Sequence, residues 1–285
     1  MKARQVIATC RQTDASLAAD LPRTAVAAES SVPLLSIKGL SVRFGGTVAL
    51  DNVSFDVKAG QICGLIGPNG AGKTTLFNCL SRLYQAGAGT IDFAGERLLQ
   101  LPRHRVARLG IGRTFQNLAL FETMSVRDNV LIGGHCRGRS GFVANALRLP
   151  ILCREERLLS ERATGLLEML ELTAIADVPV SALPFCTRKR VELARALASE
   201  PKLLLLDEPA AGLDHADLGE LGQLIVNIRD RLGITILLVE HHMSLVLRIS
   251  DQVVALDFGR KIADGTPAEV QKNPDVIRAY LGGEL

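Results

Sequence analysis

One short stretch is the strongest indication of the fold of this chain: Gly67-Pro68-Asn69-Gly70-Ala71-Gly72-Lys73-Thr74-Thr75. It fits the pattern G-x-x-x-x-G-K-[ST] and stands after an apolar run and before a helical pattern, the context that a phosphate-binding loop requires. Glycines let backbone N–H groups close around phosphate oxygens, and the start of the following helix adds positive potential. In such a loop Lys73 reaches the β and γ phosphates and Thr74 offers a hydroxyl to Mg²⁺. The sequence therefore predicts a nucleotide site built on a strand, a loop and a helix.

The sequence on either side of this loop predicts an α/β fold. Apolar and polar residues alternate through 40–44 and 53–57, which is the period of half-buried strands in an antiparallel sheet. Buried parallel strands are indicated by continuous apolar runs at residues 62–66, 203–206 and 234–239. A helical pattern follows the loop from Lys73 to Tyr84. We therefore expect a parallel sheet with helices and a separate antiparallel sub-sheet.

One stretch, residues 118–183, is predicted to be helical throughout. Leu159, Ala163, Leu166 and Leu170 recur there at helical spacing, and no strand-like run interrupts them. This pattern predicts an all-helical insertion between the strands.

The composition indicates a folded globular protein. Of the 285 residues, 47% are hydrophobic and 22% are charged, which is too apolar for a disordered chain. A net charge of +3 and an aromatic content of 4% give no sign of a nucleic-acid partner. The cysteines show no zinc-site or disulfide spacing. Residues 1–32 lack the apolar core of a signal peptide and are expected to be a flexible tail ahead of one domain, residues 33–285.

A second motif supplies carboxylates. The apolar run at 203–206 ends in Asp207, Glu208 and Pro209. Successive side chains diverge at a strand end, so Asp207 can serve a magnesium shell while Glu208 points at an attacking water. A strand that ends in two acids is by itself usually a solvated terminus. In the same chain as Lys73, it indicates nucleotide hydrolysis.

Further motifs occur in an order that one family shares. They are Gln116 in Arg113-Thr114-Phe115-Gln116, Asp214 in Ala211-Gly212-Leu213-Asp214, and His241. With the two motifs above, they make the span from about Leu34 to the C terminus resemble ATP-binding cassette (ABC) ATPases. The resemblance implies an α/β P-loop NTPase fold of ABC type, with an antiparallel β-subdomain and an α-helical subdomain inserted at about 118–183. It also implies ATP and Mg²⁺ as ligands.

The resemblance implies roles for individual residues. Phe44 would stack on adenine, Gln116 would link the magnesium site to the helical insertion, and His241 would hold the γ phosphate. The implied catalytic residues are Lys73, Gln116, Glu208 and His241. The implied nucleotide-binding residues are Phe44, Gly67, Pro68, Asn69, Gly70, Ala71, Gly72, Lys73, Thr74 and Thr75, and the implied metal residues are Thr74, Gln116 and Asp207. Taken without the resemblance, Phe44 is at least equally a core strand residue, and Gln116 is an ordinary loop amide.

The C-terminal segment, about residues 272–285, resembles one subgroup of this family. The ending Asn273-Pro274-Asp275-Val276-Ile277-Arg278-Ala279-Tyr280-Leu281-Gly282 looks like that of the ATP-binding subunits of bacterial branched-chain amino acid importers. Such subunits work in pairs at the cytoplasmic side of the inner membrane, beneath two permease subunits fed by a periplasmic or extracytoplasmic solute-binding protein. The resemblance therefore implies ATP-driven uptake of branched-chain or other hydrophobic amino acids. The sequence leaves open which solute is carried and whether the chain pairs with itself.

The signature loop departs from the family pattern. It usually reads Leu-Ser-Gly-Gly-Gln, and here it is Leu183-Pro184-Phe185-Cys186-Thr187, with Cys186 at a glycine position. Because the resemblance places this loop against the ATP of a second cassette, Leu183, Cys186 and Asp214 are expected to face a dimer partner. We expect Thr187 to cap the helix that follows.

A second departure is His242, which stands beside His241 where these importers commonly carry an acidic residue. Neighbouring side chains on a strand end point apart and no third ligand is evident, so the pair does not predict a metal site. Two alternatives to an importer ATPase stay open. One is a catalytically weakened cassette that acts as a nucleotide-binding regulatory partner, and the other is a soluble ABC protein without a transport role.

Overall fold

The computed structural model describes residues 32–115, 118–137, 150–213 and 215–281. The chain divides into two units, Met1–Ser31 and Val32–Leu285, and the described residues all belong to the second. The tail expected at residues 1–32 lies outside the described residues except for Val32.

A four-stranded antiparallel sheet begins this unit, with strand order β2-β1-β4-β5. Its strands are β1 (Leu35–Phe44), β2 (Thr47–Val57), β4 (Ala88–Phe93) and β5 (Glu96–Arg97). In β1 and β2 most apolar side chains are buried in the core and alternate with more exposed, mostly polar ones. The register pairs Leu35 with Val57 and Phe44 with Thr47. The predicted antiparallel sub-sheet is confirmed.

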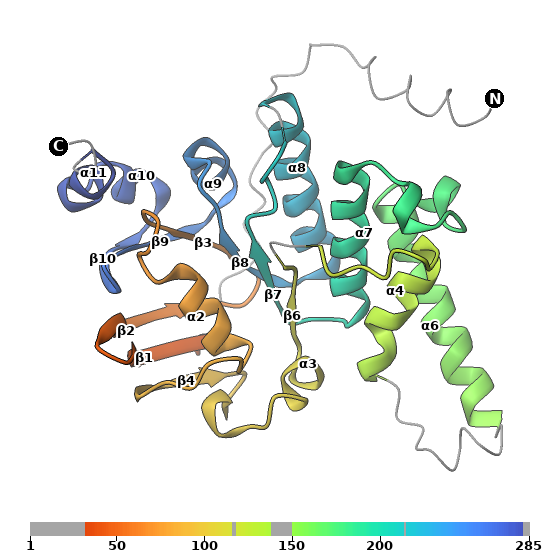
Figure 1. The fold of residues 1–285 in the computed structure, drawn as a ribbon, viewed down its shortest axis with the longest axis horizontal. Helices are drawn as coiled ribbons and strands as arrows, with labels where there is room; N and C mark the ends of the chain where they lie inside the picture. Colours follow the sequence, from red (N-terminus) through yellow and green to blue (C-terminus); the bar gives the residue numbers. More distant parts are fainter. Residues whose placement is uncertain (1–31, 116–117, 138–149, 214, 282–285) are drawn as a thin grey trace. The chain divides into compact units, whose positions relative to one another are not determined.

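A six-stranded sheet, in the order β10-β9-β3-β8-β7-β6, carries the phosphate-binding loop (Figure 1). Its strands are β3 (Ile62–Ile66), β6 (Ile111–Arg113), β7 (Leu203–Asp207), β8 (Thr235–Val239), β9 (Gln252–Asp257) and β10 (Arg260–Gly265). All neighbours are parallel except β10, which runs antiparallel to β9. Since β3, β7 and β8 are adjacent and parallel, the segments that follow Ile66, Asp207 and Val239 meet at one edge of the sheet.

Two hydrophobic cores lie on opposite faces of this sheet. In β3, Ile62 and Ile66 belong to a core shared with the larger helices, whereas Cys63 and Leu65 belong to a core shared with α2 (Lys73–Leu80) and the antiparallel sheet. Strand alternation sends successive side chains to opposite faces, so β3 is buried on both sides and fixes the position of the loop that follows it.

Helix α2 is shorter than the predicted helix from Lys73 to Tyr84. It ends at Leu80, with Ser81 as its C-cap, because Arg82 adopts a left-handed backbone with φ of 57°. The remaining helices and 3-10 turns are α3 (Arg105–Leu109), α4 (Val126–Gly134), α6 (Pro150–Met169), α7 (Phe185–Ala198), α8 (His215–Leu232), α9 (Met243–Ile249), α10 (Pro267–Gln271) and α11 (Pro274–Leu281), with Leu98–Gln100, His135–Arg137, Thr173–Ile175 and Val180–Ala182.

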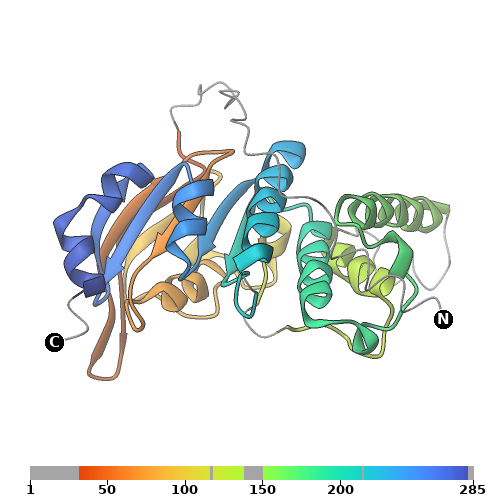
Figure 2. The same cartoon turned by 90° about the horizontal axis from the view of Figure 1, so that it is seen from above.

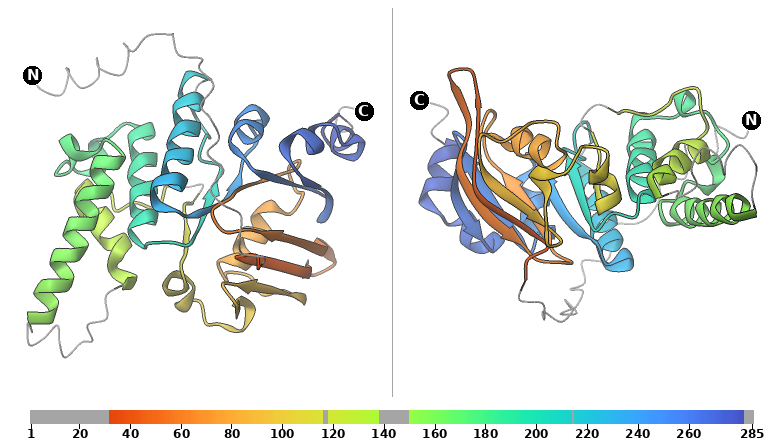
Figure 3. Two further views of the ribbon diagram at one scale, coloured as in Figure 1. Left: turned by 180° about the vertical axis from the view of Figure 1, so that it is seen from behind. Right: turned by 90° about the horizontal axis from the view of Figure 1, so that it is seen from below.

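The segment predicted as a helical insertion contains α4 and α6, which pack against each other and against α7 (Figures 2 and 3). Gly133 permits the close approach of α4 to α7, because a Cβ atom there would lie 2.0 Å from the carbonyl oxygen of Arg195. The helical group thus includes α7, beyond the predicted end at Leu183. Among the described residues, every helix is too short or too polar to span a membrane.

Candidate active site

The phosphate-binding loop lies where β3 meets α2 and surrounds a cavity of about 170 Å³. The cavity is lined by Ala49, Asn69, Gly70, Ala71, Gly72, Lys73, Thr74, Thr75, Glu208 and His241. Gly72 is the N-cap of α2 with φ of 100°, and a Cβ atom there would lie 2.6 Å from the carbonyl oxygen of Ala49. The loop therefore needs glycine at this position, and its amides lie at the N-terminus of a helix, where an anion is favoured.

Lys73 provides the positive charge of the loop. It is 6% exposed, and its Nζ donates hydrogen bonds to the carbonyl oxygens of Gly67 at 2.7 Å and Pro68 at 2.9 Å. Burial lowers the pKa of this ammonium, while the charges of Glu208 and Asp207 oppose that shift. The ammonium thus lies among oxygen acceptors beside the cavity, an arrangement that suits phosphate oxygens as further acceptors.

The C-terminal segment also contacts this loop. Tyr280 on α11 accepts a hydrogen bond at its hydroxyl oxygen from the backbone N–H of Gly67 at 2.8 Å. A Cβ atom on Gly67 would lie 2.2 Å from the carbonyl oxygen of Leu256 on β9. The first residue of the loop is therefore hydrogen-bonded to α11 and packed closely against β9. The sequence motifs give no sign of the Tyr280 contact, because it joins residues far apart in the chain.

Asp207 at the end of β7 forms a buried ion pair. Arg113 Nη2 on β6 donates to Asp207 Oδ2 at 2.9 Å, and the two side chains are 10% and 6% exposed. Arg113 Nη1 also donates to Asn78 Oδ1 and Ser81 Oγ on the α2 side, at 2.8 and 3.0 Å. From the sequence, Arg113 was predicted only as a member of the motif that contains Gln116. Its charge at the buried end of a strand was the signal that a carboxylate lies opposite it.

Glu208 follows Asp207 in a left-handed backbone conformation with φ of 50°, which is unusual for a residue other than glycine. His241 Nε2 lies 2.6 Å from Glu208 Oε1. Glu240, which is buried, accepts hydrogen bonds from the backbone N–H groups of Ala210 at 2.5 Å and His241 at 3.1 Å. This buried carboxylate joins the segments after β7 and β8, and it was not among the predicted site residues.

The donors that could hold Mg²⁺ are oxygens. Thr74 is exposed and lines the cavity, and the Asp207 carboxylate ends β7, which is separated from β3 by β8. A hydroxyl, a carboxylate and phosphate oxygens are the hard ligands that Mg²⁺ takes, so these residues fit that ion. Within the described ranges, no group of three or more His, Cys, Asp or Glu side chains could hold a metal by itself. His242 lies at the N-cap position of α9.

Several predicted site residues, Asp207 among them, do not line the cavity or lie outside the described residues. Phe44 is 47% exposed at the end of β1, and its ring packs edge-on against Tyr84 with centroids 5.0 Å apart. It is therefore a surface aromatic rather than a core residue. Gln116 and Asp214 lie outside the described residues.

The signature segment forms the start of α7. The helix begins at Phe185 with Pro184 as N-cap and without a side-chain cap, so the expectation that Thr187 caps it is wrong. Proline fits there because the first amides of a helix have no partner within the helix and its fixed φ suits the helix start. Cys186 is exposed in the first turn, whereas the Leu183 side chain is 8% exposed and belongs to the core.

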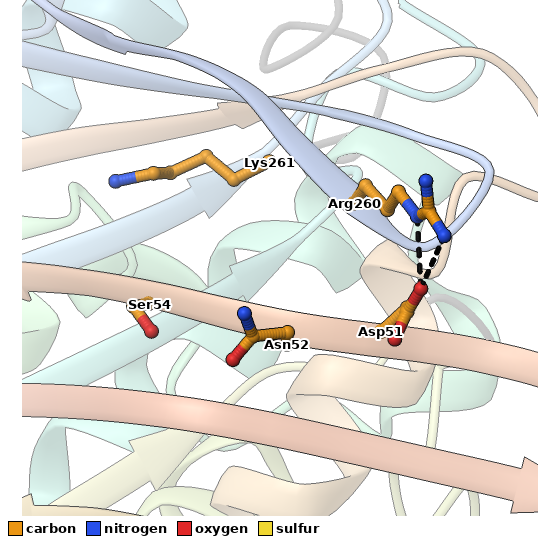
Figure 4. Close-up of a pocket in the computed structure, with 5 residues that line it drawn as sticks. All are labelled: Asp51, Asn52, Ser54, Arg260 and Lys261. Carbon is orange, nitrogen blue, oxygen red and sulfur yellow. Dashed lines mark hydrogen bonds and ion pairs between the residues drawn. The ribbon is translucent and has the colours of Figure 1, made fainter.

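A larger cavity, about 550 Å³, lies between β2 and β10 (Figure 4). It is lined by Asp51, Asn52, Ser54, Arg260 and Lys261. Arg260 points to Asp51 and forms an ion pair with it at 2.7 Å, and Lys261 pairs with Asp264 at 2.9 Å. Both cations of the larger cavity are thus paired with carboxylates. The smaller cavity, which is lined by the phosphate-binding loop and Glu208, is the candidate active site.

Comparisons with protein families match two parts of the chain. The family described as "ABC transporter" matches residues 50–211. The family described as "Branched-chain amino acid ATP-binding cassette transporter" matches residues 260–285, which include α11 and its contact with the loop.

Individual proteins are similar over nearly their whole length. The chain is 43% identical over 252 residues to the high-affinity branched-chain amino acid transport ATP-binding protein BraF of Pseudomonas aeruginosa, a match covering 88% of this chain and 99% of BraF. It is 44% identical to LivG, the protein of the same description from Salmonella typhimurium, with the same coverage. Among solved structures, the ADP conformation of MJ1267, an ATP-binding cassette of an ABC transporter, has a TM-score of 0.77 at 30% identity and covers 88% of this chain and 100% of its own. A nucleotide-free ATP-binding cassette from an ABC transporter has a TM-score of 0.75 at 30% identity, over 87% and 99% of the two chains.

Proposed function

Because the chain belongs to the ATP-binding cassette (ABC) transporter family, we propose that it is the ATP-hydrolysing subunit of an importer for branched-chain or other hydrophobic amino acids. The observation that carries this proposal is the meeting of Lys73, Glu208 and His241 around one cavity. The three residues follow or begin elements that are far apart in the chain, and parallel strands bring them to one sheet edge. This arrangement supports phosphoryl transfer to water.

The proposed reaction is attack of a water molecule on the γ phosphorus of ATP. Glu208 accepts a proton from that water as the oxygen–phosphorus bond forms, and the bond between the γ phosphorus and the bridging oxygen of ADP breaks. The ammonium of Lys73 and the amides of residues 69–75 stabilise the charge on the phosphate oxygens. His241, which contacts Glu208, is placed to bind the γ phosphate.

Mg²⁺, held by Thr74 and Asp207, would neutralise charge on the β and γ phosphate oxygens. Asp207 is already fixed by Arg113, so its carboxylate direction is set by the fold. We further propose that Gln116 joins the metal site to the helical subdomain and that Phe44, whose ring is exposed, stacks on adenine.

The proposed assembly contains a second cassette, two membrane permeases and, outside the membrane, a solute-binding protein. In it the chain would lie on the cytoplasmic side of the plasma membrane. Cys186, exposed at the start of α7, and Asp214 would face the ATP-bound partner cassette. The solute class is supported by the C-terminal family match at 260–285 and by relatives described as branched-chain amino acid transport proteins.

Uptake by cells tests the proposal. A strain that lacks this chain is complemented with the parent or with Lys73→Ala, and uptake of radiolabelled leucine, isoleucine and valine is measured. We expect the parent to restore uptake and the variant to fail at equal expression. Equal uptake with both would show that this cassette does not drive the transport. Uptake of an unrelated solute alone would contradict the amino-acid substrate but keep the ATPase.

A further inference from the structure

Lys189 on α7 lies outside the cavity, yet it contacts the turn that carries the proposed base. Its Nζ donates to the carbonyl oxygens of Ala211 at 2.7 Å, Pro209 at 2.9 Å and Glu208 at 3.3 Å. An ammonium has three N–H donors, and three carbonyl groups of one turn surround this one. Burial lowers the pKa of Lys189, and the charges of Glu240, Glu192, Cys186 and Glu208 oppose that shift.

The turn that Lys189 contacts requires external support. Glu208 has a left-handed backbone conformation, which residues other than glycine rarely adopt. Such a strained conformation persists only where the surrounding structure fixes it. Within the turn, the Ala211 N–H donates to the Glu208 carbonyl oxygen at 3.1 Å. The Glu208 N–H donates to the carbonyl oxygen of Val239, at the end of β8, at 2.9 Å. The carbonyl oxygens of Glu208, Pro209 and Ala211 all accept from Lys189. Lys189 is therefore one of the groups that hold the backbone from which the Glu208 side chain projects.

A second contact joins the same turn to the signature segment. The Phe185 ring lies 5.2 Å from Lys189 Nζ, in cation–π range, and also lies against Gly212, where an added Cβ atom would be 3.2 Å from the ring. Phe185 immediately precedes the exposed Cys186. The first turn of α7 and residues 208–212 therefore form one packed unit.

We propose that Lys189 is a positioning residue for ATP hydrolysis, which holds the backbone of Glu208 so that its carboxylate points into the cavity and which ties that carboxylate to the segment bearing Cys186. The inference rests on the proposed role of Glu208 as base. Lys189 itself contacts neither nucleotide nor water in this role. It acts by keeping a strained turn in one conformation. This conformation matters because even a small displacement of a reacting group lowers the reaction rate strongly.

The first experiment compares Lys189→Met with a matched control, Arg190→Met. Both substitutions remove a cation from α7, but Arg190 pairs with Glu171 at 3.2 Å and Glu220 at 3.6 Å instead of with the turn. We expect Lys189→Met to lower kcat about ten- to a hundredfold with KM for MgATP within about twofold of the parent, and Arg190→Met to change neither. A structural role without positioning would lower Tm and leave kcat of the folded protein at the parent value. That result would overturn the proposal.

If Lys189→Met does not fold, Lys189→Arg tests the proposal in its place. Arginine retains the charge, but its planar fork cannot place donors on the same three carbonyl groups. We expect a kcat between those of the parent and Lys189→Met, at unchanged KM. A parent-like kcat for Lys189→Arg would overturn the proposal in two cases. In the first, Lys189→Met folds and is as active as the parent. In the second, Lys189→Met does not fold.

A double-variant cycle tests whether Lys189 acts through Glu208. Residual single-turnover hydrolysis is measured for Glu208→Gln and for Glu208→Gln with Lys189→Met. Because the base is absent from both, we expect equal rates within about twofold. A further loss as large as that caused by Lys189→Met alone would show an independent effect and overturn the proposal. Absence of hydrolysis by the parent would instead overturn the proposed function, and this inference with it.

Discussion

His241 Nε2 and Glu208 Oε1 lie 2.6 Å apart, and both side chains line the cavity formed by the phosphate-binding loop. The two residues follow different strands, β8 and β7, whose parallel pairing places Val239 beside Asp207. The contact therefore depends on strand order and cannot arise from local sequence. In the proposed reaction, this pair of side chains would meet the terminal phosphate and its attacking water.

Replacing Lys73 by alanine is expected to cause a large loss of hydrolysis. A preorganised charge contact of this kind contributes about 2.7–4 kcal/mol to the transition state, so kcat should fall about a hundred- to a thousandfold. MgATP binding should weaken as well. The measurement is phosphate release at saturating MgATP, together with titration of a fluorescent nucleotide. Unchanged turnover would remove Lys73 from the proposed mechanism.

Glu208→Gln is expected to separate binding from cleavage. The amide keeps the size of the side chain and a hydrogen-bonding group near His241, but it cannot take a proton from water. ATP should then bind, be cleaved only at a small residual rate and hold two cassettes together, because bound ligand stabilises the state that it favours. Gel filtration with ATP should show a dimer that the parent does not retain. Hydrolysis at the parent rate would require a different base.

Cys186→Gly reports on the signature segment and on pairing. A glycine lets the backbone approach a phosphate held by a facing cassette, and a cysteine side chain fills that gap. We expect the ATPase rate to rise strongly if the chain pairs with itself, and only about twofold if one of two sites in a heterodimer is already intact. Steady-state ATPase measurements on the purified assembly give the answer. No gain in either assembly would mean that another group supplies the phosphate contact.

Alkylation gives an independent test of the same residue. Cys186 is exposed, whereas Cys79 is buried and its pKa is raised by burial to about 11. A thiol reacts as its thiolate, so at neutral pH Cys186 should be alkylated before Cys79. MgATP should protect Cys186 in the closed dimer of Glu208→Gln. Peptide mapping locates the label, with Cys186→Gly as control, and equal labelling with and without MgATP would contradict a facing nucleotide.

The buried pair of Arg113 with Asp207 is expected to dominate the stability of this edge. Removing one partner of a buried pair costs about 3–5 kcal/mol because the other charge stays buried. Arg113→Met should lower the free energy of unfolding by that amount. Arg162→Met is the matched control, since Arg162 pairs with Glu200 on the surface, where a pair contributes at most about 1 kcal/mol. Urea denaturation measures both, and equal losses would contradict the difference in burial.

Tyr280→Phe tests the contact between the C-terminal helix and the loop. The change leaves the ring and removes the oxygen that accepts from the Gly67 N–H. Loss of one such hydrogen bond should lower the free energy of unfolding by about 1 kcal/mol. Arg278→Met on the same helix, whose ion pair with Asp275 is exposed, should cost less. Thermal or urea unfolding compares them, and no difference between the two variants would mean that the Tyr280 hydroxyl does not stabilise the loop.

Local sequence patterns were enough to predict the strands, the phosphate-binding loop and the candidate reacting groups. The glycines and lysine of residues 67–75 predicted the loop, and alternation and apolar runs predicted both kinds of strand, because side-chain periodicity is a local property of the chain. Asp207 and Glu208 could be placed at a strand end for the same reason.

Which elements lie side by side could be learned only from the three-dimensional structure. Periodicity says how a strand is buried but not which strand lies beside it, so the insertion of β3 between β8 and β9 had to be observed. The same holds for the contacts of Arg113 with Asp207, Lys189 with the Glu208 turn and Tyr280 with Gly67, each of which joins side chains or amides distant in sequence. The helix start at Phe185 was also missed, because the expected cap at Thr187 rested on side-chain preference, while Pro184 and packing against residues 208–212 set the observed boundary.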